Sequence, residues 1–321
     1  LFMLFVFLWN RPLFLRQMLR DRHRREESYG KMFQIIFFMV TPMIFTTFLN
    51  NGSSYLDSYI YSSIQRTQGI MADSISATYG EFSNYYLPII NIPLAMASAS
   101  ASALIPEISS LYAIGSLKEA NKKINQSIRL IMFICIPVTV GLTVLAFPIM
   151  SVLFPSATVL ASRLLMSGAF HVIFIILASI TGSVLQSIGK QKVVLINAGF
   201  SLLVNLIVLT FLLFIFPQMD IYVVMLANIL FSVLYCVMNE IALRKYLNYR
   251  NALRKTYMEP LVASVLMGVV VAFVYYGLFY LIRWSLVSLV ISVLIGVLVY
   301  LVLYVNVSKT KVDKMLSMIA V

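Results

Sequence analysis

Long apolar segments separated by short basic stretches dominate this sequence. Apolar runs of about 20 residues or more recur between Met32 and Val305, and an α-helix of about that length crosses the hydrocarbon core of a bilayer. Only 11% of the 321 residues are charged, whereas about a quarter are charged in an ordinary soluble domain. The chain is therefore predicted to be an all-α, polytopic membrane protein.

Eight complete spans are expected from the apolar runs. They cover residues 32–60, 79–105, 128–147, 159–186, 193–216, 221–243, 257–282 and 285–305. Residues 1–9 are also apolar, but nine helical residues rise only about 14 Å against a hydrocarbon core of about 30 Å. This short run is predicted to be the end of a further helix.

The basic residues predict how the spans are oriented. Placing residues 11–31 in the cytoplasm and alternating thereafter leaves only Arg66, Arg163 and Arg283 on the outer side, among 24 Lys and Arg residues. The C-terminus is then cytoplasmic. The net charge is +12, but the basic residues that produce it lie between apolar segments and not on one soluble face. Nucleic acid is therefore not expected as a partner.

The segment 79–115 is apolar yet contains Pro88, Pro93 and Pro106, and eight of the nine residues at 95–103 are Ala or Ser. Small residues let a second helix approach closely. Each proline removes a backbone donor, so a carbonyl in the preceding turn needs another partner. Two interpretations remain open: a tightly packed helix without a ligand, or a wall of a transport cavity.

Local signals predict where some helices bend or end. Thr41-Pro42 is expected to kink the first complete span. Pro106 is expected to end the segment 79–105, and Ser116 with Glu119 has the pattern of a capping box for the next helix.

Catalytic and metal-binding motifs are not found. The sequence has no Gly-rich phosphate loop, no nucleophile elbow and no spaced cluster of His, Cys and carboxylates. Its two cysteines, Cys135 and Cys236, lie in apolar runs and are expected to be packing residues. The chain is therefore not expected to be an enzyme, and no cofactor or metal is predicted.

Ionisable and polar side chains inside the apolar runs are the candidate functional residues, because they are costly in hydrocarbon. In this orientation Asp57, Arg66, Asp73, Glu81 and Arg163 all lie near the outer face, where they either reach water or contribute to a site. His171 is either a packing residue or a proton relay.

Asparagines form a second candidate set. Asn197, Asn205 and Asn228 are expected to make interhelical hydrogen bonds, or to touch sugar hydroxyls if they face a cavity. Asn84 and Asn91 are seven residues apart, about two helical turns, and share a face if the helix continues through Pro88.

The region from Ser102 to Phe154 resembles a known transporter superfamily. The order of Leu104-Ile105-Pro106, a charged loop, Ile136-Pro137 and Ala146-Phe147-Pro148-Ile149 is similar to the multidrug/oligosaccharidyl-lipid/polysaccharide (MOP) flippases. The similarity is greatest to the polysaccharide-biosynthesis and stage V sporulation protein B-like branch, near the lipid II flippases. That family implies two six-helix lobes facing each other across a central cavity, often with two extra C-terminal helices.

The resemblance implies a domain organisation in which this chain is a C-terminal portion. Residues 1–10 would end the last helix of a missing first lobe, which is the expected intramolecular partner, and residues 32–243 would form the second lobe. The extra helices would occupy 257–305, with basic cytoplasmic loops at 11–31 and 244–256 and a cytoplasmic tail at 306–321.

The function implied by the resemblance is alternating-access flipping of a lipid-linked oligosaccharide, or of a related envelope polysaccharide precursor, in a bacterial inner membrane. The predicted substrate contacts are Asn84, Asn91, Ser98 and Arg163. The predicted ion- or proton-coupling residues are Asp57, Glu81 and His171. Lipid II flippases place arginine on the helix equivalent to residues 79–105, whereas this chain has no Lys or Arg there.

Three other functions remain open from the sequence. One is cation-coupled multidrug export within the same superfamily. Another is membrane assembly without transport. The third is an integral-membrane glycosyl or acyl transferase, which the lack of clustered carboxylates and histidines disfavours.

Overall fold

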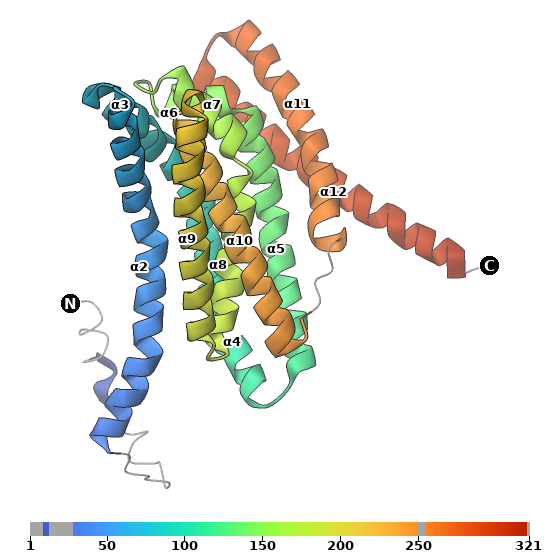
Figure 1. The fold of residues 1–321 in the computed structure, drawn as a ribbon. Coiled ribbons are helices and arrows are strands. Elements are labelled where there is room, and N and C mark those ends of the chain that lie inside the picture. The colour runs from blue at the N-terminus through green and yellow to red at the C-terminus, as the bar shows by residue number, and fades with distance from the viewer. Residues whose placement is uncertain (1–8, 13–27, 250–253, 320–321) are drawn as a thin grey trace. The chain divides into compact units, whose positions relative to one another are not determined.

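The computed structural model describes residues 9–12, 28–249 and 254–319, and these are overwhelmingly helical (Figure 1). Parts of the predicted basic stretches, residues 13–27 and 250–253, and residues 1–8 of the predicted partial helix lie outside the described residues. The described helices, including two π-helical turns (η1, η3) and one 3-10 turn (η2), are α2 (Tyr29–Thr67), α3 (Ala72–Gly80), η1 (Glu81–Tyr86), α4 (Leu87–Ala113), α5 (Leu117–Val144), α6 (Ala146–Leu153), α7 (Val159–Gly168), α8 (His171–Ser187), α9 (Gln191–Ile215), η2 (Pro217–Met219), α10 (Ile221–Leu247), η3 (Arg254–Met258), α11 (Glu259–Ile282) and α12 (Ser285–Ile319).

The prediction of a polytopic all-α membrane protein is confirmed. Seven helices in the described part of the chain are long and apolar enough to span a membrane, and an eighth span is formed if α7 and α8 are counted as one bent pair. These eight correspond to the eight expected apolar runs. Agreement is close because the bilayer thickness sets the minimum length of each run.

The described chain is divided into two compact units, with the boundary between Thr41 and Pro42. The first unit contains the N-terminal part of α2, in which the side chains from Lys31 to Val40 are all exposed. The second unit runs from Pro42 onward and contains the remaining helices. Although the boundary falls at the predicted kink, α2 is one continuous helix through Pro42.

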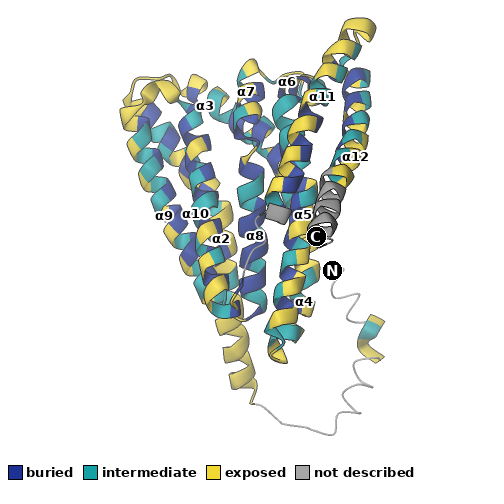
Figure 2. Cartoon of the chain, turned by 90° about the vertical axis from the view of Figure 1, so that its right-hand side faces the viewer, coloured by how far each residue is buried: buried dark blue, intermediate teal, exposed yellow. Residues whose placement is uncertain are grey.

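In the second unit, α8 packs against both α4 and α10, and α10 also packs against α9. Their facing sides are buried, as the dark residues of Figure 2 show, and they form the main apolar core together with α5 and α7. A smaller cluster joins α11 and α12 to Leu145 and includes Met267, Val271, Tyr275 and Tyr300. The helix pair α11–α12 therefore packs on α5 through its own apolar contacts.

The helical segment that begins with α3 ends later than the sequence predicted. Pro106 does not end the helix: α4 continues to Ala113. The end comes at Gly115, whose φ of +75° suits a left-handed closing residue. The amide of Ser116 donates to the carbonyl oxygen of Leu111 at 3.0 Å, and that of Gly115 to Tyr112 at 3.1 Å, which is the Schellman arrangement.

The expected capping box at Ser116 is wrong. The next helix, α5, does begin at Leu117, but the Ser116 side chain makes no capping hydrogen bond. Its backbone amide already serves the Schellman motif of the preceding helix.

Two irregular turns, which the sequence did not predict, lie next to each other. The expected span 159–186 is broken at Ala169 and Phe170, and α7 and α8 meet at a bend of 54°. The π-helical turn η1 packs against α7, and the Tyr86 hydroxyl at its end donates to the Gly168 carbonyl oxygen at 3.1 Å. That hydrogen bond satisfies a carbonyl at the break, where the regular helix ends.

A polar cavity as the candidate transport site

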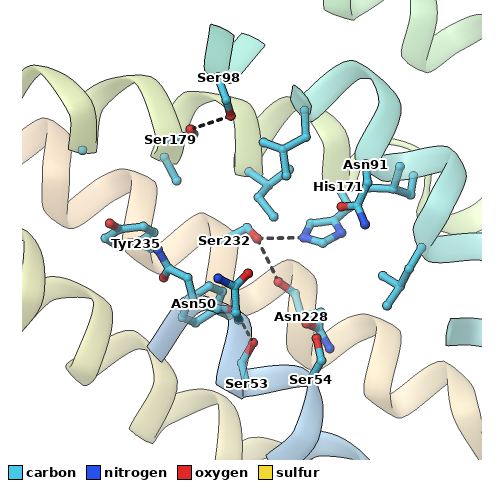
Figure 3. A pocket seen from close by; sticks show the side chains of 18 of the residues that line it. Asn50, Ser53, Ser54, Asn91, Ser98, His171, Ser179, Asn228, Ser232 and Tyr235 are labelled. Carbon is cyan, nitrogen blue, oxygen red and sulfur yellow. Dashed lines mark hydrogen bonds between the residues drawn. The ribbon is translucent and has the colours of Figure 1, made fainter. Parts of the chain in front are cut away.

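A cavity of about 340 Å³ opens between α2, α4, α8 and α10 in the second unit (Figure 3). Apolar residues, chiefly Leu87, Ile90, Leu94, Ile175 and Phe231, form part of its wall. The polar side chains that line it are Asn50, Asn51, Ser53, Ser54, Asn91, Ser98, His171, Ser179, Ser183, Gln186, Asn228, Ser232 and Tyr235.

The polar lining consists of amides and hydroxyls together with one imidazole. Among the described residues that line the cavity there is no Lys, Arg, Asp or Glu. Amide and hydroxyl groups both donate and accept hydrogen bonds. The cavity is therefore suited to a neutral ligand that carries many hydroxyl or amide groups, with the apolar wall taking its carbon faces.

Two sets of hydrogen bonds meet at Asn228, between the cavity wall and a buried acid. His171 Nε2 and Ser232 Oγ are 2.7 Å apart, and the serine donates to the backbone carbonyl oxygen of Asn228 at 3.1 Å. If the serine proton is directed at this carbonyl, Ser232 Oγ accepts from His171 Nε2. The Asn228 side-chain amide donates to Asp57 Oδ2 at 2.9 Å and to the Val224 carbonyl oxygen.

Asp57 does not line the cavity but lies directly behind Asn228. It is only 1% exposed. Its second oxygen, Oδ1, has no hydrogen-bond partner among the described residues. The carboxylate is therefore held by a single side-chain amide that itself belongs to the cavity wall.

The small residues of α4 divide between packing and the cavity. Ala97 and Ala101 are each 2% exposed, so they pack against neighbouring helices as one sequence interpretation required. Ser98 lines the cavity, and its hydroxyl lies 3.4 Å from that of Ser179 on α8. Ser102 is exposed. The helix is therefore a packed helix on one face and a cavity wall on another.

Three of the seven predicted site residues, Asn91, Ser98 and His171, line the cavity, and Asp57 adjoins it. Asn84 and Arg163 are exposed and lie outside the lining. Although the helix does continue through Pro88, the π-turn η1 alters the helical phase between Asn84 and Asn91, so their spacing does not place them on one face.

Glu81 also lies away from the cavity. Both of its carboxylate oxygens are 3.2 Å from the backbone nitrogen of Thr158, the residue that caps α7. In this position Glu81 holds the start of α7 against η1, because a carboxylate is a favourable partner for the free amides of a helix N-terminus. Ion coupling through Glu81 stays a prediction.

Most of the cavity lining was not predicted from the sequence. On α10, Asn228, Ser232 and Tyr235 recur at helical spacing, which is the one signal that identifies a shared face. The interhelical hydrogen bonds expected of Asn228 and Asn197 are confirmed, the latter to Asn239 Oδ1 at 2.9 Å. Asn205 is buried, but its side-chain oxygen has no partner in the described structure.

Similar proteins are found by sequence and by structure. The family model "Lipid II flippase MurJ" matches residues 29–295. The lipid II flippase MurJ of Bacillus subtilis is 26% identical over 183 residues, which are 56% of this chain and 34% of that protein. A Rickettsia prowazekii protein named "Probable lipid II flippase MurJ" is 27% identical over 183 residues, 54% of this chain and 35% of its own length.

A solved structure of a lipid II flippase MurJ, in an inward closed conformation, superposes with a TM-score of 0.65 at 18% identity. The match covers 94% of this chain and 60% of the solved one. That structural likeness supports the fold, and the chain spans about a third of the length of the two curated relatives. Because the family model covers most of the sequence, the chain belongs to the lipid II flippase MurJ family.

Proposed function

We propose that this chain forms one wall of a flippase that moves a lipid-linked oligosaccharide, or a related envelope polysaccharide precursor, across a bacterial inner membrane by alternating access. The observation that carries the proposal is a polar cavity of about 340 Å³ without charged lining residues, inside a bundle of membrane-spanning helices. Polar side chains at membrane depth are retained where they serve a cavity or one another. Membership in a flippase family favours the interpretation that these side chains serve a transport cavity.

The chemistry of the lining indicates which part of the precursor it contacts. A diphosphate favours Arg or Lys as partners, and none of the described lining residues is Arg or Lys. Sugar hydroxyls and acetamido groups match the asparagine, glutamine and serine side chains. We infer that this wall recognises the saccharide, which includes the sugar part of lipid II as well as that of other lipid-linked glycans.

We infer that ion or proton coupling involves His171 and Asp57, which lie on opposite sides of Asn228, one in the cavity wall and the other behind it. His171 is linked through Ser232 to the backbone carbonyl oxygen of Asn228, and Asp57 accepts from the side-chain amide of the same residue. A ligand that engages Asn228 from the cavity side changes the only side-chain hydrogen bond that Asp57 accepts among the described residues. This contact provides a physical link between substrate binding and the buried acid.

Substitutions in the cavity are expected to reduce transport without reducing membrane abundance. Asn91→Ala removes one uncharged hydrogen-bonding group, worth about 1 kcal/mol, and should slow transport of the labelled lipid-linked saccharide about fivefold. Ser98→Leu should reduce it further, since leucine occupies space in the cavity. Transport is measured in reconstituted vesicles as the outward arrival of the labelled lipid.

Asn84→Ala is the matched control, because it changes the same residue type on the same helical segment away from the cavity. It should transport normally. Arg163→Gln tests the cationic residue predicted from the sequence. Normal transport by both Asn91→Ala and Ser98→Leu at normal abundance would remove the cavity from the substrate path.

A cation-coupled multidrug exporter is the competing function. Such an exporter favours carboxylates near its cationic substrate, and the described lining has none. Accumulation of a cationic dye by the same vesicles, without movement of the lipid-linked saccharide, would replace the flippase proposal with this alternative.

The proposed orientation places the C-terminus and the α4–α5 turn in the cytoplasm and the α9–α10 turn outside. Both native cysteines are buried, so single exposed cysteines can be labelled selectively. In intact cells the Pro217→Cys variant should react with an impermeant maleimide and the Glu119→Cys variant should not. The opposite pattern would reverse the orientation.

A further inference from the structure

Helix α2 forms part of the cavity wall without packing its backbone closely on another helix. It supplies Asn50, Asn51, Ser53 and Ser54 to the lining of the cavity. None of the closely packed helix pairs in the described chain includes α2, however. The position of this wall therefore depends on the side-chain contacts that α2 makes next to the cavity and beyond it.

Buried polar residues recur at every fourth position along one face of α2. They are Ser53, Asp57, Tyr61 and Gln65. Residues four apart lie one above the other on a helix, so this polar face runs from the cavity toward the C-terminal end of α2. Ser53 lines the cavity, and Asp57 accepts the hydrogen bond from Asn228 that is described above.

Asp220, at the start of α10, binds the far end of this polar face. Its Oδ1 accepts hydrogen bonds from the Tyr61 hydroxyl and from Gln65 Nε2, the latter at 2.5 Å. Hydrogen bonds to an ionised acceptor are stronger than those between neutral groups. We refer to Tyr61, Gln65 and Asp220 as the Asp220 latch, because these residues join α2 to α10 beyond the cavity.

The backbone of Asp220 indicates that its side chain is needed at this position. Its φ is +47° and its ψ is −126°, a conformation that glycine adopts readily and that strains other residues. Such strain persists where the surrounding structure fixes the residue. The two hydrogen bonds from α2 to the carboxylate supply that restraint.

We propose that Asp220 is a positioning residue for transport. The Asp220 latch holds the C-terminal half of α2 against α10 and thereby keeps the four polar cavity residues of α2 in place. This role rests on the proposed function, since it concerns the same cavity. Without the latch, α2 is displaced in a larger fraction of molecules. Because only a complete cavity binds substrate, the apparent dissociation constant rises as the fraction of complete cavities falls.

The first test measures the position of α2 and needs no substrate. In the full-length protein with Cys135→Ala and Cys236→Ala, the buried Ser53→Cys thiol should react slowly with a small membrane-permeant thiol reagent. Asp220→Gly removes the carboxylate but suits the positive φ, so the turn should still fold. This variant should raise the reaction rate about tenfold, whereas Asp220→Asn keeps an acceptor oxygen and should stay near the wild-type rate.

Two controls separate displacement of α2 from general loosening. Ser264→Cys places the same thiol at a fully buried position on α11, and its rate should not change when Asp220 is replaced. Asp73→Ala removes an exposed acid from the first turn of α3, and it should leave the Ser53→Cys rate unchanged. Equal rates at Ser53→Cys with and without Asp220→Gly, or equal acceleration at Ser264→Cys, would refute the latch.

Transport in reconstituted vesicles provides the second test. Asp220→Gly should raise KM for the labelled lipid-linked saccharide about threefold, which corresponds to α2 in place in about a third of molecules. The maximal rate should change little, because the variant lowers binding and not a later step. Asp220→Asn should restore the wild-type KM. A faster Ser53→Cys reaction with an unchanged KM would refute the positioning role. If the wild type moves no lipid-linked saccharide, the proposed function fails, while the thiol rates still decide whether the latch holds α2.

Discussion

Replacing Asn228 with leucine is expected to lower the free energy of unfolding by about 3 kcal/mol, near the upper end of the cost of leaving a buried acceptor unpaired. The Asn228 side-chain amide donates a hydrogen bond to Asp57 Oδ2. The other carboxylate oxygen, Oδ1, has no hydrogen-bond partner among the described residues. The variant leaves a 1% exposed carboxyl group without that donor. Denaturant unfolding of the detergent-purified protein measures the loss.

Two comparisons separate this loss from a general intolerance of leucine. Asn205→Leu also replaces a buried asparagine, but one whose side-chain oxygen has no recorded partner, so it should cost little. The double variant Asp57→Leu/Asn228→Leu should recover most of the stability, because removing both partners leaves no unpaired group. If that double variant also transports normally, Asp57 has no part in coupling. A single Asn228→Leu variant as stable as wild type would mean that the Asp57–Asn228 bond contributes nothing.

Gly168→Ala is expected to cost about 2 kcal/mol by overpacking. A Cβ built on this residue would lie 2.5 Å from the Tyr86 hydroxyl oxygen and 2.7 Å from the Met225 sulfur. All three residues are buried, so the Tyr86 and Met225 side chains or the backbone of the bent α7–α8 pair must shift. The midpoint of thermal or denaturant unfolding reports the effect.

Gly141→Ala is the control for the change itself. This glycine lies within α5 and a Cβ there meets nothing within 4 Å. Alanine favours a helix interior by about 0.5 to 1 kcal/mol over glycine, so the control should be as stable as wild type or slightly more so. A Gly168→Ala variant as stable as wild type would show that Tyr86 packs less closely on the α7–α8 break than the structure indicates.

The comparisons refine the classification reached from the residues. The superfamily resemblance is confirmed at the level of the lipid II flippase MurJ family, and the finer placement beside the stage V sporulation protein B-like proteins stays a prediction. The expectation that the chain is not an enzyme agrees with membership in a family of transporters. The division into a second lobe and two additional helices stays a prediction that the separate α11–α12 cluster supports.

Part of the candidate site was accessible from the sequence because polar residues inside apolar runs are costly. This argument identified Asn91, His171 and Asp57, and the run of small residues at 95–103 identified Ser98. The structure brings all four to or beside one cavity. The same argument also selected Asn84, Glu81 and Arg163, which lie elsewhere. A cost in hydrocarbon shows that a side chain needs a partner, but not whether that partner is a ligand, a backbone amide or water.

By itself the sequence determined the number, approximate limits and helical nature of the spans, since bilayer thickness and backbone hydrogen bonding leave few alternatives for long apolar runs. Tertiary structure alone decided the π-turn η1, the break at Ala169 and Phe170, and the course of α4 through Pro106. At the break, a side chain from a distant segment, Tyr86, supplies a partner for the Gly168 carbonyl. These irregularities set the helical phase, and the phase decides which polar residues face the cavity.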